Sequence, residues 1–480
     1  MNVLLYVFDA LRADHVGVHG YDLDTTRALD SLAADGVVFE QCITPSTWTR
    51  PVAASILSGL YPPVHGTRGR LSSYEPPVPS LPKHFQKSGH QTAMIGSMPN
   101  IRPEFGFDRG FDHYHDVYTD PRVEEERGEL RPGVPQIRAE DLTRGILEWF
   151  DNEYSANSFF MMAWSYETHA PYDPPEGYRD FIDPEYDGDV DGTPESFSDV
   201  SSQADRKHLK SLYDGCVDYN DDCLGDIMSG LRDRGLYEDT LIICIGDHGD
   251  GHGEHPGFFG HGITPYEGLV HVPCIARTPN DVAGHRFESV SSLIDLYPSL
   301  LDACDIEIGE QLRSSLQGVS LSGALSGEKH RSSDRRVFVD GDRPHYESQA
   351  SYHVAREDQW KLIDLLDSTE MTSGRNLVEL ARDAVTSGKL PDILRNPFYY
   401  WNRQIGSNET MLFDLESDLG EQSNLVESRL EKREQLEHVL DEWRAECSEL
   451  NDYFDVEPEE ITINSGSKQR LQALGYLKDE

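Results

Sequence analysis

Short apolar runs alternate with longer amphipathic stretches over the first 300 residues of the chain. The clearest helical pattern lies between Leu209 and Leu231, where apolar residues recur mostly three and four positions apart and Gly235 follows as a stop. Strands that alternate with helices predict an α/β fold with a large, mostly parallel central sheet and helices on both faces. In such sheets ligands bind beyond the carboxyl ends of the strands. The runs with the length and composition of buried strands lie at residues 3–8, 37–42, 91–95, 158–164, 240–245 and 272–277.

The pattern changes after about residue 304. A helical pattern over about 430–444 follows strand-like segments at residues 337–339, 351–356, 360–365 and 411–414. We therefore expect a large α/β domain over residues 1–332 and a smaller C-terminal α+β subdomain over residues 333–480, with a short antiparallel sheet and a helix. Residues 368–406, between two of the predicted strands, are expected to form an insertion.

The composition is strongly acidic. The 480 residues contain 42 Lys and Arg against 86 Asp and Glu, which gives a formal net charge of −44. Such a surface repels nucleic acid and anionic membranes, so neither is expected as a main partner. Only 10 of the basic residues are Lys, and the acidic residues are spread over the whole chain. A small soluble domain needs a net charge of only about 2 to 8 for colloidal stability, so we expect a salt-loving source.

The N-terminus and the cysteines predict a cytoplasmic protein. The first residues carry no basic region and no cleavage site of a signal peptide, and no stretch of about 18 apolar residues predicts a membrane span. The chain has 7 cysteines without a CxxC motif, which fits buried thiols in a reducing compartment.

The acidic run at residues 187–192 resembles the start of an EF-hand calcium loop. The twelfth position of such a loop requires glutamate, but Ser198 lies there. We therefore expect a solvated acidic loop rather than a calcium site.

Four side chains with metal-binding or nucleophilic chemistry follow predicted strands. Asp9 comes directly after the first strand, and Asp247 and His248 come after the fifth. Thr49 follows the second strand and precedes Pro51 and an apolar run, the pattern of a helix start. The positive end of a helix dipole favours an anion or an alkoxide at this position. Together the four residues can hold one divalent cation that lowers the pKa of the threonine hydroxyl.

Each of these residues alone also has an ordinary structural explanation. An aspartate after a strand often caps a helix, Asp-His-Gly can form a turn, and a threonine before a helix can act only as its cap. Their joint occurrence on loops at one sheet edge favours a shared site. Further candidates are the histidines that follow the fourth and fifth strands, namely His169, His252, His255 and His261.

Several short motifs follow one another along nearly the whole chain. They lie at residues 8–14, 49–51, 58–62, 65–66, 106–112, 169–172, 246–249, 259–262, 271–273, 412–415, 424–425 and 471–476. In their residues and order these motifs resemble the sulfatase family of the alkaline phosphatase superfamily. The resemblance implies a large α/β domain that holds the site and a four-stranded C-terminal subdomain.

The nucleophile position departs from the family pattern. Sulfatases carry Cys or Ser in the pattern Cys/Ser-x-Pro-x-Arg and oxidise it to formylglycine. Aligning on Arg50 would make Ser46 the nucleophile but would place Trp48 where proline is expected. Aligning on Pro51 makes Thr49 the nucleophile, keeps the Ser-Gly pair at the helix end and leaves alanine in place of arginine. We prefer this second register. Because the threonine Cβ carries a methyl group, we expect no formylglycine.

The metal ligands depart from the pattern as well. Where sulfatases pair two aspartates the chain has Asp9 and Ala10, and where they often have asparagine it has His248. One carboxylate fewer and one imidazole more favour Mn²⁺ or Zn²⁺, with Ca²⁺ and Mg²⁺ as alternatives. We expect one such ion, with Asp9, Thr49, Asp247 and His248 as its ligands.

The resemblance also implies substrate-binding residues. His261 occupies the position of the family's substrate-binding lysine, and His169 resembles the histidine that contacts the ester or protonates the leaving group. Arg12 and Arg102 are expected to add positive charge near the site, although Arg12 can equally pair with Asp14. No Asp with two His marks a second metal site, and the remaining candidates for one are His252, His255 and His261.

These residues predict a metal-dependent ester hydrolase with Thr49, His169 and His261 as catalytic residues. Attack on phosphorus needs no aldehyde, so the threonine favours phosphate or phosphonate esters over sulfate esters. One alternative is a transferase that moves a phospho-alcohol group onto a glycan or lipid, although such relatives usually carry membrane helices. Another is a non-catalytic binding protein, against which the intact set of four residues argues. The expected partner is a small-molecule or glycan ester.

Overall fold

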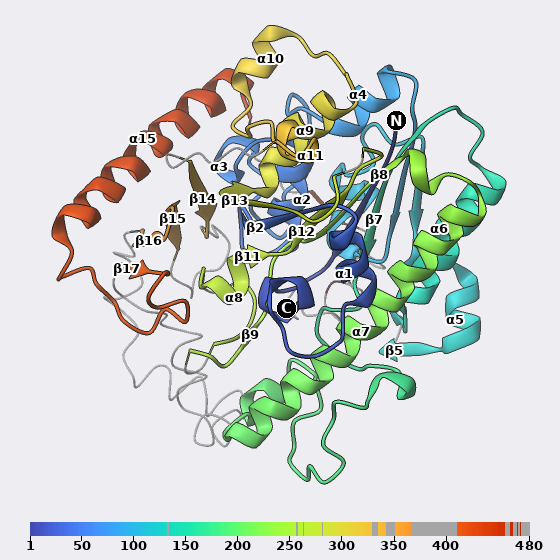
Figure 1. Ribbon diagram of the computed structural model, residues 1–480, viewed down its shortest axis with the longest axis horizontal. Coiled ribbons are helices and arrows are strands. Elements are labelled where there is room, and N and C mark those ends of the chain that lie inside the picture. Colours follow the sequence, from blue (N-terminus) through green and yellow to red (C-terminus); the bar gives the residue numbers. More distant parts are fainter. Residues whose placement is uncertain are drawn as a thin grey trace.

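A nine-stranded mixed sheet forms the centre of the protein (Figure 1). Its strands are β1 Asn2–Phe8, β2 Val37–Ile43, β3 Gln91–Gly96, β4 His113–Asp116, β7 Phe159–Ser165, β8 Thr240–Gly246, β11 His271–Val272, β12 Cys274–Arg277 and β13 His285–Ser292. They lie in the order β11-β2-β12-β8-β1-β7-β3-β4, with β13 paired to β2. The computed structural model describes residues 1–131, 134–255, 258–262, 264–280, 282–328, 335–341, 351–366, 410–456, 461–463, 468 and 471.

The strand directions bring four loops to one edge of the sheet. Strand β1 pairs in parallel with both β7 and β8, and β3 pairs in parallel with β7. Strand β12 is antiparallel to both β8 and β2, so β2 runs in the same direction as β8. The carboxyl ends of β1, β2, β7 and β8 therefore share an edge, and the predicted site residues follow these four strands.

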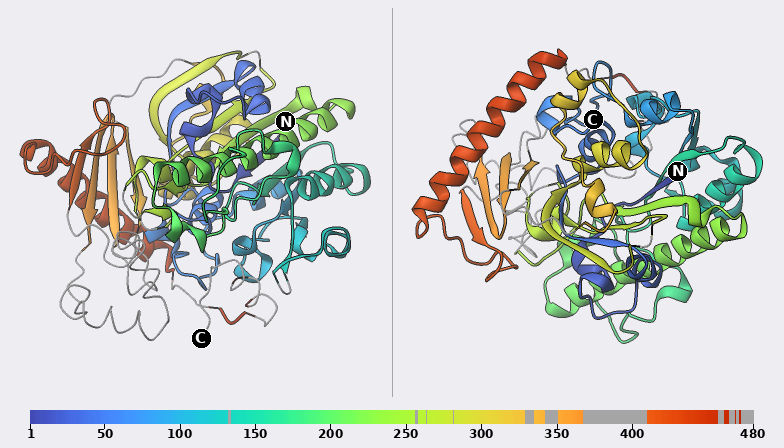
Figure 2. Two further views of the ribbon diagram at one scale, coloured as in Figure 1. Left: turned by 90° about the horizontal axis from the view of Figure 1, so that it is seen from below. Right: turned by 45° about the horizontal axis from the view of Figure 1, so that its top comes forward.

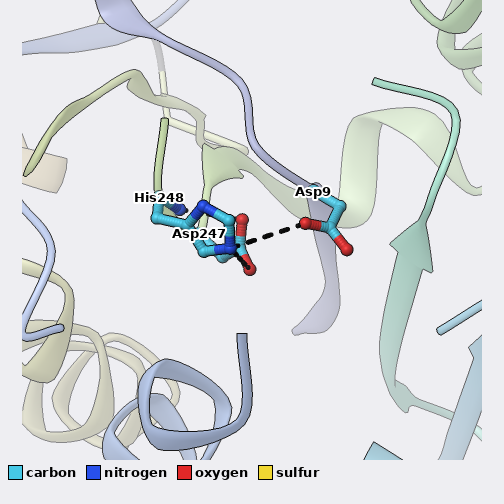
Figure 3. Close-up of side chains that lie close together, drawn as sticks. All are labelled: Asp9, Asp247 and His248. Atoms are coloured by element: carbon cyan, nitrogen blue, oxygen red, sulfur yellow. Dashed lines mark hydrogen bonds and ion pairs between the residues drawn. The ribbon is translucent and has the colours of Figure 1, made fainter. Parts of the chain in front are cut away.

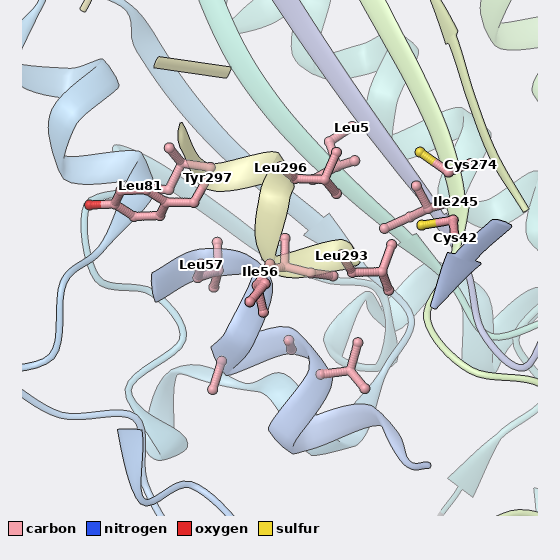
Figure 4. Packing of buried hydrophobic residues seen from close by; sticks show 14 of the residues in the cluster. Leu5, Cys42, Ile56, Leu57, Leu81, Ile245, Cys274, Leu293, Leu296 and Tyr297 are labelled. Atoms are coloured by element: carbon pink, nitrogen blue, oxygen red, sulfur yellow. The ribbon is translucent and has the colours of Figure 1, made fainter. Parts of the chain in front are cut away.

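Helices cover both faces of the sheet, as the sequence predicts. On one face lie α2 Thr49–Ser58, α4 Leu81–Lys87 and α9 Leu296–Ala303; on the other lie α1 Arg27–Ala34, α6 Ala139–Asn152 and α7 Gln203–Asp233. The side chains of β1 alternate between these two cores, with Leu5 in the first and Tyr6 in the second. Figure 4 shows Ile56 of α2 beside Leu293 in the first core, near Ile245 of β8.

A second, four-stranded antiparallel sheet follows in the C-terminal part. It contains β14 Arg336–Asp340, β15 Tyr352–Glu357, β16 Trp360–Leu365 and β17 Met411–Asp414, and α15 Leu430–Phe454 lies beside it (Figure 2). Trp443 of α15 stacks on Phe338 and meets the ring of Tyr61 edge-on, so the helix also packs against the large domain. The predicted insertion at residues 368–406 lies outside the described residues, and the boundary at 332/333 stays a prediction.

The central sheet differs from the sequence prediction in two additional strands and in one predicted strand that is divided into two. Strands β4 and β13 were not predicted, because both consist mostly of polar residues and contain no apolar run. The predicted strand at residues 272–277 is divided at Pro273, which has no N–H to donate to a ladder, and both parts run antiparallel to their neighbours. Thr49 lies at a helix start, as predicted, but as the first residue of α2, and Trp48 takes the cap position.

The remaining elements are short. They are α3 Pro62–His65, α5 Pro121–Arg127, α8 Glu267–Val270, α10 Glu310–Ser315, α11 Ser322–Leu325, β5 Glu129–Arg131, β6 Val134–Pro135, β9 Gly251–His252 and β10 Phe259–Gly260. Residues 187–192 lie in a mostly exposed loop. All seven cysteines are free thiols, and six of them are buried. Among the described residues, the helices lack the length and apolar character needed to cross a membrane.

Candidate active site

Residues from three strand ends converge on one buried cluster. Asp9 follows β1, Asp247 and His248 follow β8, and Thr49 begins α2 after β2. One ligand atom each of Asp9, Asp247 and His248 lies within 4.8 Å of the others (Figure 3). The Thr49 Oγ1 lies 3.3 Å from the His248 Nε2, and all four residues are 0 % exposed. The strand-end arrangement thus brings together the four side chains that the sequence singled out.

Hydrogen bonds to the backbone fix the strand ends that carry the cluster. The hydroxyl of Thr168 donates to the main-chain carbonyl of Asp9 at 2.5 Å, and that of Thr44 donates to the carbonyl of Asp247 at 2.5 Å. Ala10 has a left-handed backbone with φ 60°, which lets its N–H donate to the Asp247 Oδ1 at 2.9 Å. This conformation costs an L residue roughly 1–2 kcal/mol, so the loop stores local strain beside the cluster.

The His248 ring presents its Nε2 lone pair to the cluster. Its Nδ1–H donates to the Gly249 carbonyl at 2.9 Å, and burial lowers the pKa of His248 well below its ordinary value, so the imidazole is neutral. The Nε2 lies 3.4 Å from the Asp247 Oδ2 and 3.7 Å from the Asp9 Oδ1. A lone pair and carboxylate oxygens repel each other unless a cation lies among them.

Three carboxylate oxygens of the cluster have no hydrogen-bond partner. They are both oxygens of Asp9 and the Oδ2 of Asp247, and all three are buried. Burial, followed by the charges of Asp247 and Asp250, raises the pKa of Asp9 well above its ordinary value. Burial also raises the pKa of Asp247 to about 7. Buried carboxylates normally pair with a cation or hydrogen-bond donors. Two carboxylates and one imidazole therefore fit a divalent transition metal ion.

The geometry favours Thr49 over Ser46 as the nucleophile candidate. The Ser46 hydroxyl donates to the Asp340 carbonyl at 2.9 Å and thus faces the C-terminal sheet. Arg50, the landmark of the alternative register, is buried with its guanidinium 3.7 Å from the centre of the Phe105 ring and donates to main-chain carbonyls, including that of Asn100. Neither side chain shows the contact with His248 that Thr49 makes.

Two further histidines lie beside the cluster. The ring of His261 lies 4.5 Å from that of His248 and 4.8 Å from that of His169. The His169 Nδ1–H donates to the Ala170 carbonyl at 2.5 Å, and burial, followed by the charge of His261, lowers the pKa of His169 to about 3. His169 is therefore neutral near pH 7. The His261 Nδ1 instead lies 3.0 Å from a carboxylate oxygen of Asp250.

Asp250 is a site residue that the sequence analysis missed. It is fully buried, and the Tyr172 hydroxyl donates to its second oxygen. Burial alone would raise its pKa, but His261 and then His169 outweigh this effect and lower the pKa of Asp250 below its ordinary value. The signal was present as a further carboxylate directly after the Asp-His-Gly motif, but its partner His261 depends on how the following loop folds.

The two predicted substrate-binding arginines lie in ion pairs. Arg12 is buried, and its guanidinium contacts both Asp14 and Glu254, at 2.8 and 2.9 Å. This arrangement favours the structural alternative for Arg12. Arg102 donates from Nε to Asp116 at 2.7 Å. Substrate binding by either arginine stays a prediction.

The other histidines of the loop take structural positions. His252 lies against Arg12 and Tyr172, and His255 stacks on the Tyr266 ring at 3.6 Å. Within the part of the chain that the structure describes, Asp9, Asp247 and His248 form the one group of three or more close metal-ligand side chains.

Comparisons with known proteins agree with the fold and motifs. The family model described as Sulfatase matches residues 1–306. An arylsulfatase of Clostridium perfringens is 26 % identical over 427 residues, which cover 75 % of this chain and 85 % of that protein. Among solved structures, a phosphonate monoester hydrolase of Agrobacterium radiobacter superposes with a TM-score of 0.69 at 18 % identity and covers 93 % of this chain and 96 % of its own.

A further solved structure was determined in complex with its substrate, D-glucosamine-2-N,6-O-disulfate. It superposes with a TM-score of 0.66 at 18 % identity, and the match covers 93 % of this chain and 98 % of that one. At this level of identity the likeness concerns the fold alone. Because the family model matches more than half of this chain, the chain belongs to the sulfatase family of the alkaline phosphatase superfamily.

Proposed function

We propose that this sulfatase-family hydrolase cleaves phosphate or phosphonate esters with Thr49 as its nucleophile. The observation that carries the proposal is the position of the Thr49 Oγ1, 3.3 Å from the His248 Nε2 at the edge of a buried cluster with unpaired carboxylates. Thr49 is also the first residue of α2, where the helix dipole stabilises a developing alkoxide. The phosphonate monoester hydrolase with the same fold adds support from likeness.

Asp9, Asp247 and His248 would hold a divalent cation, with Mn²⁺ or Zn²⁺ favoured by the mixed oxygen and nitrogen donors. When bound, such an ion supplies positive charge that lowers the pKa of a neighbouring hydroxyl and neutralises the oxygens of the ester. The protein holds the Thr49 hydroxyl beside this cation position, 3.3 Å from the His248 Nε2, and all four side chains are fully buried.

The reaction proceeds in two displacements. The Thr49 oxygen attacks phosphorus, the bond to the leaving oxygen breaks, and a covalent ester of Thr49 forms. Water then attacks the same phosphorus, releases the acid and restores the hydroxyl. His261, bonded to a carboxylate through Nδ1, is placed to donate a proton to the leaving oxygen. His169 is neutral and donates from Nδ1 to the backbone, so its Nε2 accepts the proton of the Thr49 hydroxyl in the first displacement and returns it in the second. His261, which has given its proton to the leaving oxygen, takes up the proton of the attacking water.

Threonine favours phosphoryl over sulfuryl chemistry. A formylglycine hydrate can release sulfate by expelling it from carbon, whereas a threonine sulfate ester must be cleaved by a second attack on sulfur. Phosphate and phosphonate esters of an ordinary alcohol undergo that second displacement in one site. A sulfate ester therefore remains the second candidate substrate, with a small molecule or a glycan as the leaving alcohol.

The test is a substrate panel on the wild type and two variants of residue 49. p-Nitrophenyl phosphate, phenylphosphonate and sulfate are assayed with Mn²⁺ in molar potassium chloride, because the net charge of −44 predicts a protein adapted to salt. We expect turnover of a phosphorus ester that falls at least about 10³-fold in Thr49→Ala and is largely retained in the matched Thr49→Ser. Full turnover in Thr49→Ala would refute the nucleophile assignment.

The panel also separates the alternatives. Added glycerol yields a glycerol ester in place of the free acid if the protein acts as a transferase. A protein that only binds its ligand turns over none of the three esters.

A further inference from the structure

The loop after β8 folds back on itself as a small ribbon. Strands β9 and β10 are antiparallel, with His252 opposite Phe259 and Gly251 opposite Gly260. The next pair in this register is Asp250 with His261. Gly260 and Gly262 on either side of His261 have φ +75° and +78°, which other residues rarely adopt. The ribbon therefore sets the contact between Asp250 and His261, and the two glycines permit the turn that presents the histidine.

The Asp250 carboxylate is fully committed to protein donors. Its Oδ1 lies 3.0 Å from the His261 Nδ1, and its Oδ2 accepts a hydrogen bond from the Tyr172 hydroxyl. Its main-chain carbonyl accepts a hydrogen bond from the buried Arg12 guanidinium at 2.8 Å. Asp250 thus differs from Asp9, whose two oxygens have no such partner. It acts as a fixed acceptor and does not serve as a ligand of the cluster.

This anchoring determines which atom of His261 faces the reaction. Because Nδ1 is bonded to Asp250, the opposite ring nitrogen, Nε2, is the atom left to meet a substrate. The ring lies between those of His169 and His248, at 4.8 and 4.5 Å, and its side chain is 16 % exposed, whereas His248 is 0 % exposed. The hydrogen bond from Tyr172 to the second oxygen of Asp250 keeps this carboxylate from rotating. The imidazole that is bonded to its first oxygen therefore keeps its orientation.

We propose that Asp250 and Tyr172 are positioning residues that fix the imidazole of His261 with Nε2 toward the leaving oxygen of the substrate. The proposal rests on the proposed function and assigns it two residues outside the predicted site. Neither residue touches the substrate; both act through His261. A fixed ring matters because a proton donor must lie within about 2.6–3.2 Å of the oxygen that it protonates.

The test is a double-mutant cycle read out with leaving groups of different basicity. Asp250→Asn keeps the shape of the side chain but replaces one of its two acceptor oxygens by an NH₂ group. The amide therefore cannot accept hydrogen bonds from both His261 and Tyr172. We expect kcat to fall roughly 10- to 10²-fold for an aliphatic leaving alcohol, less than the roughly 10²- to 10⁴-fold contribution of a general acid because His261 itself remains. For p-nitrophenol, which leaves without a proton, kcat should change little. KM should change less than kcat.

The cycle is completed in the His261→Ala background. There Asp250→Asn should lower kcat by less than about twofold, because a residue that acts through His261 has nothing left to position. Tyr172→Phe is the matched second variant, which keeps both acceptor oxygens and should show the same leaving-group dependence at smaller size. If thermal unfolding shows that Asp250→Asn folds poorly, Tyr172→Phe tests the proposal in its place.

The outcomes distinguish the two levels of the account. An equal loss from Asp250→Asn with and without His261, or a loss equal for all leaving groups, would overturn the positioning role while leaving the function intact. Turnover that survives Thr49→Ala would overturn the proposed function and the role of Asp250 with it.

Discussion

Two buried carboxylate clusters of this protein differ in how their charge is balanced. At the edge of the central sheet, Asp9 and Asp247 face the His248 Nε2, with three carboxylate oxygens that have no hydrogen-bond partner. Beside the C-terminal sheet, Lys361 lies 2.9 Å from Glu267 and 2.8 Å from Glu421. The second cluster contains its own cation, and the first contains neutral imidazole only. Buried carboxylates that the chain leaves unpaired therefore mark a place for an added cation, whereas Glu267 and Glu421 already share Lys361.

A cavity does not make this distinction. A cavity of about 230 Å³ is lined by Glu267 and Glu421 together with Arg12, Glu254 and Tyr266. It therefore lies on the self-neutralised cluster, whereas Thr49 and His261 are not among its lining residues. In this protein the unpaired carboxylates and this cavity therefore mark different places.

The largest expected effect comes from removing a carboxylate of the unpaired cluster. Asp247→Asn should lower kcat/KM at least about 10⁴-fold, because the residue would hold the cation beside the nucleophile. Metal-free Asp247→Asn should be no less stable than the metal-free wild type, because the variant has one buried unpaired charge fewer. Steady-state kinetics and chemical unfolding measure the two quantities. A variant that keeps its activity would contradict the assignment.

Lys361→Met should have the opposite profile. It leaves Glu267 and Glu421 buried without their shared cation, so the free energy of unfolding should fall by about 3–5 kcal/mol. The activity of the folded fraction should stay within about twofold of the wild type, since Lys361 pairs with Glu267 and Glu421 and not with Asp9 or Asp247. Denaturant unfolding tests the first statement, and a loss below about 1 kcal/mol would show that the pair is not needed.

Metal addition should stabilise the wild type through the unpaired cluster alone. Mn²⁺ at 100 times its Kd should raise the free energy of unfolding by about 2.7 kcal/mol over the chelator-treated protein. The same addition should leave Asp9→Asn unchanged and should still stabilise Glu421→Gln, the matched control in the other cluster. Equal stabilisation of Asp9→Asn would place the ion elsewhere.

A further effect, gradual in pH, concerns the paired cluster. Burial alone would raise the pKa of Glu267, but Lys361 and then Arg356 outweigh it and lower the pKa to about 2. A lowered folded-state pKa contributes stability above the ordinary value near 4.5, and this contribution is lost as the pH falls toward 2. The difference in unfolding free energy between wild type and Glu267→Gln should shrink by up to about 1.4 kcal/mol per pH unit below pH 4.5. A difference constant with pH would contradict this.

The sequence predicts the parts of the fold and site that depend on local pattern. Buried parallel strands read as apolar runs, and the rule that ligands bind beyond their carboxyl ends is enough to group Asp9, Thr49, Asp247 and His248. Strands β4 and β13 were not predicted because they consist mostly of polar residues.

Pairings between distant residues were beyond the sequence. The contact between Asp250 and His261 depends on the register of two strands of two residues each, which no periodicity reveals. The sequence left two roles for Arg12, substrate binding and an ion pair with Asp14. Its second ion-pair partner, Glu254, lies 242 positions away in the sequence. The salt bridges of Lys361 connect β16 with Glu267 at the start of α8 and with Glu421 in the loop after β17, so these residues become neighbours only in the folded chain.

The most direct test of the central claim is a crystal structure of the Mn²⁺-loaded protein with anomalous scattering measured at the manganese edge. We expect one anomalous peak, within about 2.0–2.3 Å of oxygens of Asp9 and Asp247 and of the His248 Nε2, with the Thr49 hydroxyl facing it. A map without a peak among these three side chains, or with its peak beside Glu267 and Glu421, would contradict the account.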